Sequence, residues 1–217
     1  MPHWRTEQRP RVSVAILAKA PLAGFAKTRL IPHLGAEGAA ALQRWLLQRT
    51  VTTALTADIG PVTLWCTPDA GHPDFAMCRA FGPLALRQQP DGDLGERMQA
   101  AIAGSDTPAG TLVVGTDCPV LTPGLLRQAA CVLADHDATV VPAEDGGYVL
   151  IGMREASARV FTDVDWSTTR VMAQTRARLA ETGWRWREFE PLWDVDRSED
   201  LERLIEYFPS SMNKAKA

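Results

Sequence analysis

The stretch "VSVAILAKAPLAGFAKTRL", from Val12 to Leu30, joins an apolar run to a basic loop. Its first seven residues are apolar and partly β-branched, and a lysine and a proline follow closely, which predicts a buried strand over 12–18. The remainder contains Lys19, Lys27 and Arg29 and no acidic residue. Since the whole chain is slightly acidic, with a formal net charge of −3, this local excess of positive charge needs an explanation.

Short apolar runs alternate with helical patterns along the rest of the chain. Further strands are predicted at 61–66, 84–89, 111–117, 138–143, 147–153 and 184–190. Helices are predicted at 36–57, 94–104, 168–181 and 198–208, and one more follows Thr122 and Pro123, an N-cap residue and a first helical residue. The alternation predicts an α/β fold, a three-layer α/β/α sandwich around a mixed, mostly parallel sheet. Without internal repeats or linkers, we expect one domain over 1–217, with flexible tails at about 1–10 and 210–217.

Composition narrows the class of protein. Of the 217 residues, 46% are hydrophobic and 23% charged, as in ordinary globular proteins. No apolar run approaches the roughly 18 residues of a membrane span, and no excess of basic residues suggests nucleic-acid binding. The four cysteines form no C-x-x-C pair and the histidines no H-E-x-x-H, which argues against a zinc site or a disulfide framework. We therefore expect a cytoplasmic protein with reduced, mostly buried thiols.

Charged residues follow several of the predicted strands. In open α/β sheets, ligands bind beyond the carboxyl ends of the strands. Lys19, Lys27 and Arg29 follow the first strand, and such cations neutralise phosphate oxygens, which an arginine can bind with two donors at once. A solvated loop is the ordinary alternative. Their place behind a buried strand favours a phosphate site.

Carboxylates follow other strands. Asp117 lies at the end of "TLVVGTD", and Asp194 and Asp196 lie two residues apart in "PLWDVD". Mg²⁺ binds hard oxygen ligands, typically one or two carboxylates together with substrate phosphates and water. The three aspartates are therefore candidate ligands for Mg²⁺ or Mn²⁺. The ordinary alternatives are a turn before Pro119 for Asp117, and exposed charges ahead of a helix for Asp194 and Asp196.

Five motifs together resemble a known family. In chain order they are "VAILAKAPLAGFAKTRL", "GTDCPVL", "EDGGYVLIGM", "DWSTTRV" and "WDVDRSEDL". They resemble the bacterial glycosyltransferase-like proteins known as radical-SAM/selenodomain-associated transferases, over about 12–208. That family belongs to the nucleotide-diphospho-sugar transferase superfamily, which has the glycosyltransferase-A fold. The superfamily also includes phospholactate guanylyltransferases and molybdenum-cofactor guanylyltransferases.

The resemblance implies roles for particular residues. It places nucleotide binding at Ala18, Lys19, Ala20, Lys27, Arg29, Gln89, Gly92, Asp93 and Arg97, with the segment 89–98 near the base and ribose. It assigns the metal to Asp117, Asp194 and Asp196, and catalysis to Lys27, Arg29 and Asp117. It implies acceptor binding at Asp145, Gly146, Gly147, Tyr148, Trp166, Ser167 and Thr168. For the two acceptor-binding segments, the ordinary alternatives are a turn at "DGGY" and a helix start at 166–168 with Ser167 as its N-cap.

Three functions stay open from the sequence. The first is a metal-dependent transferase that uses a nucleotide-activated donor. This enzyme would be glycosyltransferase-like and would act on a small acceptor. The second is a nucleotidyltransferase that joins a nucleotide to a phosphorylated small molecule and releases pyrophosphate. The third is a non-catalytic nucleotide-binding protein. Two missing signatures support it, because the chain lacks both the paired glycines of nucleotidyltransferases and the Asp-x-Asp motif of sugar transferases. The edge strand 184–190 could pair with a second copy in a homodimer.

Overall fold

The computed structural model describes residues 11–207 of the chain. The predicted flexible tails, 1–10 and 210–217, lie outside the described residues. Within the described range, no helix is long and apolar enough to cross a membrane.

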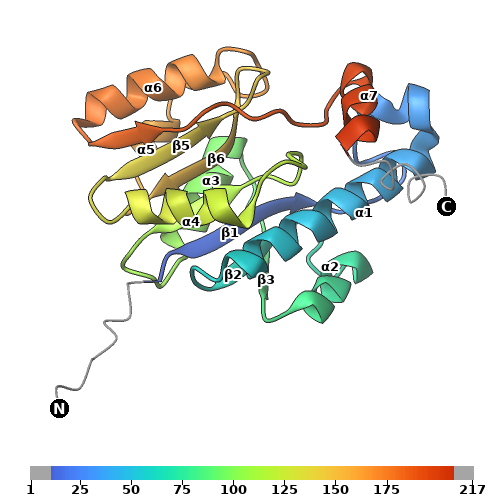
Figure 1. Cartoon of the computed structure of the whole chain (residues 1–217), viewed down its shortest axis with the longest axis horizontal. Helices are drawn as coiled ribbons and strands as arrows, with labels where there is room; N and C mark the ends of the chain where they lie inside the picture. The colour runs from blue at the N-terminus through green and yellow to red at the C-terminus, as the bar shows by residue number, and fades with distance from the viewer. Residues whose placement is uncertain (1–10, 208–217) are drawn as a thin grey trace.

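One mixed sheet forms the centre of the molecule (Figure 1). Its strands are β1 (Ser13–Lys19), β2 (Val62–Thr67), β3 (Ala85–Gln88), β4 (Thr111–Val114), β5 (Ala138–Pro142), β6 (Tyr148–Met153) and β7 (Trp186–Glu188). Their spatial order is β3-β2-β1-β4-β6-β5-β7. All neighbours are parallel except β6, which runs antiparallel to β4 and β5. Because β6 is reversed, it begins at the edge of the sheet where the other strands end.

Helices cover both faces of the sheet. They are α1 (Ile31–Ala57), α2 (Pro73–Met77), α3 (Leu94–Ala103), α4 (Pro123–Val132), α5 (Ala158–Phe161), α6 (Val171–Thr182) and α7 (Ser198–Tyr207), with the 3₁₀ turns η1 (Thr28–Leu30) and η2 (Cys78–Phe81). Apolar residues of α1 and α4 pack on one face of β1 and β4. Those of α3, α5 and α6 pack on the other face. The predicted three-layer α/β/α fold is therefore confirmed.

Two helical predictions need correction. The first long helix was predicted from residue 36, whereas α1 begins at Ile31 and is broken at Gly35, where φ is 70° and ψ is 168°. The predicted start at residue 36 is therefore the first residue after this break, where the longer part of α1 begins. The short helices α2 and α5 were not predicted, since five and four residues are too few to show a helical period.

Candidate active site

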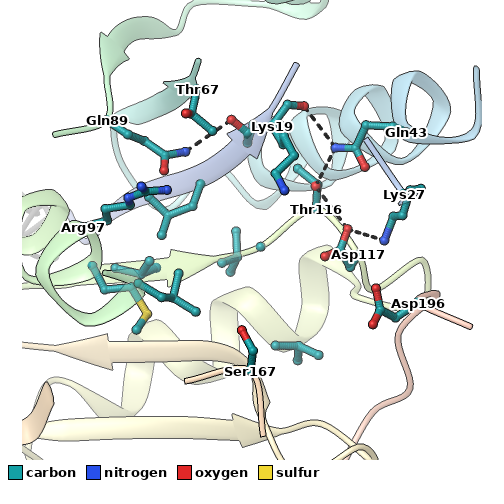
Figure 2. A pocket seen from close by; sticks show the side chains of 18 of the residues that line it. Lys19, Lys27, Gln43, Thr67, Gln89, Arg97, Thr116, Asp117, Ser167 and Asp196 are labelled. Atoms are coloured by element: carbon teal, nitrogen blue, oxygen red, sulfur yellow. Dashed lines mark hydrogen bonds and ion pairs between the residues drawn. The ribbon is translucent and has the colours of Figure 1, made fainter. Parts of the chain in front are cut away.

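A cavity of about 570 Å³ opens at the carboxyl ends of β1 and β4 (Figure 2). Its walls include the last residues of β1, the loop after β4, Thr67 at the end of β2 and Tyr148 at the start of β6. Of the predicted site residues it brings together Ala18, Lys19, Lys27, Arg29, Gln89, Arg97, Asp117, Tyr148, Ser167 and Asp196. The carboxyl edge of the sheet is thus where the predicted residues meet, as the α/β rule requires.

Other predicted residues do not line this cavity: Ala20, Gly92, Asp93, Asp145, Gly146, Gly147, Trp166, Thr168 and Asp194. Two of the residues predicted to bind a nucleotide, Ala20 and Asp93, have structural roles. The Ala20 amide donates to the Thr67 carbonyl oxygen, 2.7 Å away. Gly92 precedes Asp93, whose carboxylate accepts the Glu96 amide at 2.9 Å and caps α3.

Lys27 lies at the centre of the charged end of the cavity. Its side chain is only 4% exposed, and its ammonium group lies 2.6 Å from Oδ1 of Asp117. The same Nζ donates to the Val195 carbonyl oxygen at 2.6 Å. The Val195 amide in turn donates to the Asp117 carbonyl oxygen at 2.8 Å. Lys27 therefore fixes both the loop after β4 and the segment before α7, which lie far apart in sequence.

A second ion pair ties the same two parts of the chain together. Arg29 in η1 pairs with Asp196, and Asp196 lines the cavity. The amides of Asp196 and Arg197 donate to the Asp200 carboxylate at 2.9 and 2.7 Å, which fixes the segment at the start of α7. Unlike Lys27, Arg29 is 61% exposed, so solvent screens its pair.

Carboxylates crowd around Asp194. Burial is the main cause that raises its pKa to about 7, and the charges of Asp145 and Asp117 add to the effect, while Lys27 opposes it. Mg²⁺ and Mn²⁺ prefer oxygen ligands, and a group of carboxylates with excess negative charge supplies donor atoms of that kind. Within residues 11–207, however, no three or more His, Cys, Asp or Glu side chains are arranged to hold a metal ion between them.

Gln43 and Thr116 belong to the site, although no motif singled them out. The Gln43 side chain, in α1, is buried and its Nε2 donates to the Lys19 carbonyl oxygen at 3.2 Å and to the Thr116 hydroxyl at 3.0 Å (Figure 2). Gln43 thereby joins the ends of β1 and β4. Its sequence signal is a glutamine on the apolar stripe of a helix, four residues before Leu47.

Replacing Gln43 with Ala is expected to destabilise the fold by about 1–2 kcal/mol, because the Lys19 carbonyl group and the Thr116 hydroxyl lose a buried partner. Urea unfolding measures the loss. Gln48→Ala provides the control, since Gln48 lies on the same helix with a half-buried side chain. Equal stabilities for the two variants would show that Gln43 has no bridging role.

Tyr148 and Ser167 also line the cavity. The Tyr148 hydroxyl donates to the Met98 sulfur at 3.6 Å, and burial raises the Tyr148 pKa above its usual range. Trp166 stacks edge-on against Tyr148, with ring centroids 6.5 Å apart. The prediction that Ser167 caps a helix is wrong: its φ is 64°, and α6 begins only at Val171.

The "DGGY" segment forms a tight turn that packs on the loop before α6. The Asp145 carboxylate accepts the Gly147 amide at 2.8 Å. Gly146 has a φ of +92°, and a Cβ atom there would lie 2.3 Å from the Thr169 carbonyl oxygen. Only glycine fits this close approach. The ordinary role of a turn is therefore confirmed, and acceptor contact at Asp145, Gly146 and Gly147 stays a prediction.

The cysteines match the expectation of mostly buried thiols. Cys66, Cys78 and Cys118 are buried, and Cys131 is exposed. Burial raises the Cys118 pKa to about 12, and the nearby charges of Asp194 and Asp117 add to the shift. A thiol that stays protonated is a poor nucleophile. Covalent catalysis by Cys118 therefore has no support from its surroundings.

The chain is similar to one protein family and to several solved structures. The model of the family DUF2064, described as uncharacterized protein conserved in bacteria, matches residues 50–168. No curated protein matches the chain. A solved structure from Desulfovibrio desulfuricans G20, described as a candidate nucleotide-diphospho-sugar transferase, is 26% identical, with a TM-score of 0.81 over 92% of this chain and 87% of that one.

Two more distant structures share the fold. A nucleotidyl transferase from Methanothermobacter thermautotrophicus is 14% identical, with a TM-score of 0.60 over 93% of this chain and 99% of that one. A cytidylyltransferase from Leptospira borgpetersenii is also 14% identical, with a TM-score of 0.62 over 93% of this chain and 89% of that one. The fold expected from the five motifs is confirmed, and the narrower radical-SAM-associated family stays a prediction.

Proposed function

Because the chain belongs to the bacterial family DUF2064 and has the fold of nucleotide-diphospho-sugar transferases, we propose that it transfers a glycosyl group from a nucleotide-activated donor to a small acceptor. Its class as a transferase is the part that the likeness to the Desulfovibrio protein supports directly. The donor, the acceptor and the need for a metal are parts of the proposal.

The polarity of the cavity carries this proposal. Figure 2 shows Gln89 and Arg97 on one side, Lys27, Asp117 and Asp196 on the other, and Lys19 between them. Apolar side chains of α3, Leu94 and Met98, line the cavity beside Arg97. A nucleotide has the same polarity, with a flat base, a ribose and then charged phosphates. The base would lie along α3, and the phosphates would extend toward Asp117.

The carboxylates at the charged end fit a divalent cation in donor chemistry. Asp117 and either Asp194 or Asp196 would hold Mg²⁺ or Mn²⁺, which when bound would supply positive charge to phosphate oxygens. Lys27 and Arg29 would stabilise negative charge that develops on the phosphates as the donor bond breaks. The acceptor would enter along Tyr148 and Ser167, which also line the cavity.

Nucleotidyl transfer is the second candidate, and one observation favours it. Four cationic side chains, Lys19, Lys27, Arg29 and Arg97, line a single cavity. That much positive charge would suit the triphosphate of a nucleoside triphosphate as well as a diphosphate. In this reaction the acceptor phosphate attacks the α-phosphorus and pyrophosphate leaves, so release of pyrophosphate distinguishes the two reactions.

A thermal-shift panel tests the proposed donor. Nucleotide sugars and nucleoside triphosphates are each added with Mg²⁺, with Mn²⁺ or with a chelator. We expect a nucleotide sugar with metal at about 100 times its Kd to stabilise the protein by roughly 2.7 kcal/mol. That corresponds to a rise in Tm of about 5–10 °C. A shift with triphosphates alone, together with pyrophosphate release, would replace glycosyl by nucleotidyl transfer. Binding without turnover for all acceptors would favour a non-catalytic nucleotide-binding protein.

A further inference from the structure

A groove of about 900 Å³ lies at the edge of the sheet opposite the candidate active site. Val12, which directly precedes β1, and Ala109, which precedes β4, line it. Residues at the carboxyl ends of α1 and α4 also line it, as does Arg154, which follows the antiparallel strand β6. The groove is therefore built around the starts of β1 and β4, whose other ends carry the candidate active site.

The lining of this groove combines apolar and basic residues. Its apolar members include Val12, Ala57, Ile59, Ala109, Ala130 and Leu133. Its charged members are Arg11, Arg127, Arg154 and Asp58. Three cations thus face one carboxylate in a chain whose formal net charge is −3, so the groove carries a local excess of positive charge.

Two of the three arginines already have partners. Arg11 forms an ion pair with Asp58 at 2.9 Å. Arg127 donates to the carbonyl oxygens of Thr56 and Ala57 at 2.7 and 3.0 Å, which holds it against the last turn of α1. These contacts fix one side of the groove and leave its positive charge in excess.

Arg154 is the arginine of the groove that lacks a partner. Its side chain is exposed and forms no hydrogen bond or ion pair with any residue of the described range, 11–207. Its backbone is held in place, because its amide donates to the Asp137 carbonyl oxygen at 3.0 Å. A Cβ atom at Gly110 would lie only 2.9 Å from the Arg154 Cα atom. The guanidinium, with five N–H donors, therefore extends from a fixed point beside the groove.

We propose that this groove binds a small organic carboxylate with an apolar body. The body lies on the apolar lining, and the carboxylate accepts two parallel hydrogen bonds from the Arg154 guanidinium. The volume and the mostly apolar lining, with few placed polar groups, are typical of small-molecule sites. The site is separate from the candidate active site, and its test does not depend on the proposed transfer reaction.

The charge of the groove also distinguishes between occupants. The segment 1–10 directly precedes Arg11, one of the lining residues. That segment contains Arg5 and Arg9 but only one acidic residue, Glu7. Because like charges repel, the excess of arginine in the groove disfavours this segment and favours an anion.

Calorimetric titration with octanoate tests the proposal. Octanoate should bind at least about tenfold more tightly than octanamide, which has the same chain without the charge. Acetate, which lacks the apolar chain, should bind at least about 100-fold more weakly than octanoate. Arg154→Gln should weaken octanoate binding by about 10- to 100-fold, as expected for a lost charge-assisted hydrogen bond. Arg79→Gln is the matched control, because Arg79 is exposed and does not line the groove.

Alkylation of Cys131 tests whether octanoate binds in this groove. Cys131 lines the groove and is exposed, whereas Cys66, Cys78 and Cys118 are buried. Octanoate at about ten times its Kd should slow the reaction of Cys131 with N-ethylmaleimide by about tenfold, since only the unoccupied groove reacts. Mass spectrometry of the labelled peptide measures the rate.

Four results would overturn the proposal: no binding of octanoate, equal affinity for octanamide, unchanged affinity in Arg154→Gln, or an unchanged rate of Cys131 alkylation. Two others would assign the groove to a different occupant. Tighter octanoate binding in Trp4→Ala, which removes the largest apolar side chain of the segment 1–10, would assign it to that segment. A dimer that octanoate dissociates in sedimentation would assign it to a second copy of the chain.

Discussion

Replacing Asp117 with asparagine is expected to lower the rate of group transfer by about 100- to 1,000-fold, the range found when one preorganised electrostatic contact is removed. Asparagine keeps the shape of the side chain but removes its charge. The backbone bond from Val195 to the carbonyl oxygen of residue 117 does not involve that side chain. Metal-dependent nucleotide binding should be lost together with the rate. Initial rates and metal titrations of the bound nucleotide measure both effects.

Asp106→Asn is the matched control for this substitution. Asp106 lies in the loop before β4, so the same charge is removed at the opposite edge of the sheet. Its kinetics should equal those of the wild type. Metal-dependent nucleotide binding that survives in Asp117→Asn would remove Asp117 from the metal site, whatever the effect on the rate.

Replacing Lys27 with methionine is expected to cost about 2–3 kcal/mol of unfolding free energy, somewhat less than the 3–5 kcal/mol typical of breaking a fully buried ion pair. The side chain of Lys27 is 4% exposed, but that of Asp117 is 48% exposed and regains some hydration. The substitution also leaves the Val195 carbonyl group without its lysine donor and removes the cation that opposes the high pKa of Asp194. Urea unfolding measures the change.

Arg29→Met provides the comparison, because Arg29 belongs to the same loop but its ion pair is exposed. It should cost less than about 1 kcal/mol. The double variant Lys27→Met/Asp117→Asn should recover part of the loss, since neither charge is left alone. Equal costs for the two single variants would show that burial of Lys27 contributes nothing.

The strands were predictable because their sequence signals are local. β1, β2 and β4 are short apolar runs. The start of α4 has a local signal too: Thr122 stands before Pro123, which predicts an N-cap, and its hydroxyl accepts the Leu125 amide at 3.1 Å. The predicted strand 111–117 ends early, at Val114, because Gly115 and the following residues turn into the site. An apolar run does not reveal where a strand leaves the sheet.

The charged half of the site was predictable for a similar reason. Cations and carboxylates that directly follow apolar runs are visible in sequence, and Lys27, Asp117 and Asp196 do meet in one cavity. The pairing of each cation with its carboxylate was not visible, since it depends on the return of the segment 193–196 to the first loop. Gln43 was missed because a glutamine in a helix can face solvent, and only the packed structure shows it between two strand ends.

The bond from Lys27 to the Val195 carbonyl group spans 168 positions of the chain. During synthesis, the ribosome delivers the amino-terminal strands first, and the segment that completes the charged end of the cavity emerges much later. The nascent protein can therefore pair β1, β2, β3 and β4 while Lys27 still lacks one of its two partners. The charged end of the cavity is therefore completed late in translation, after most strands of the sheet have been made.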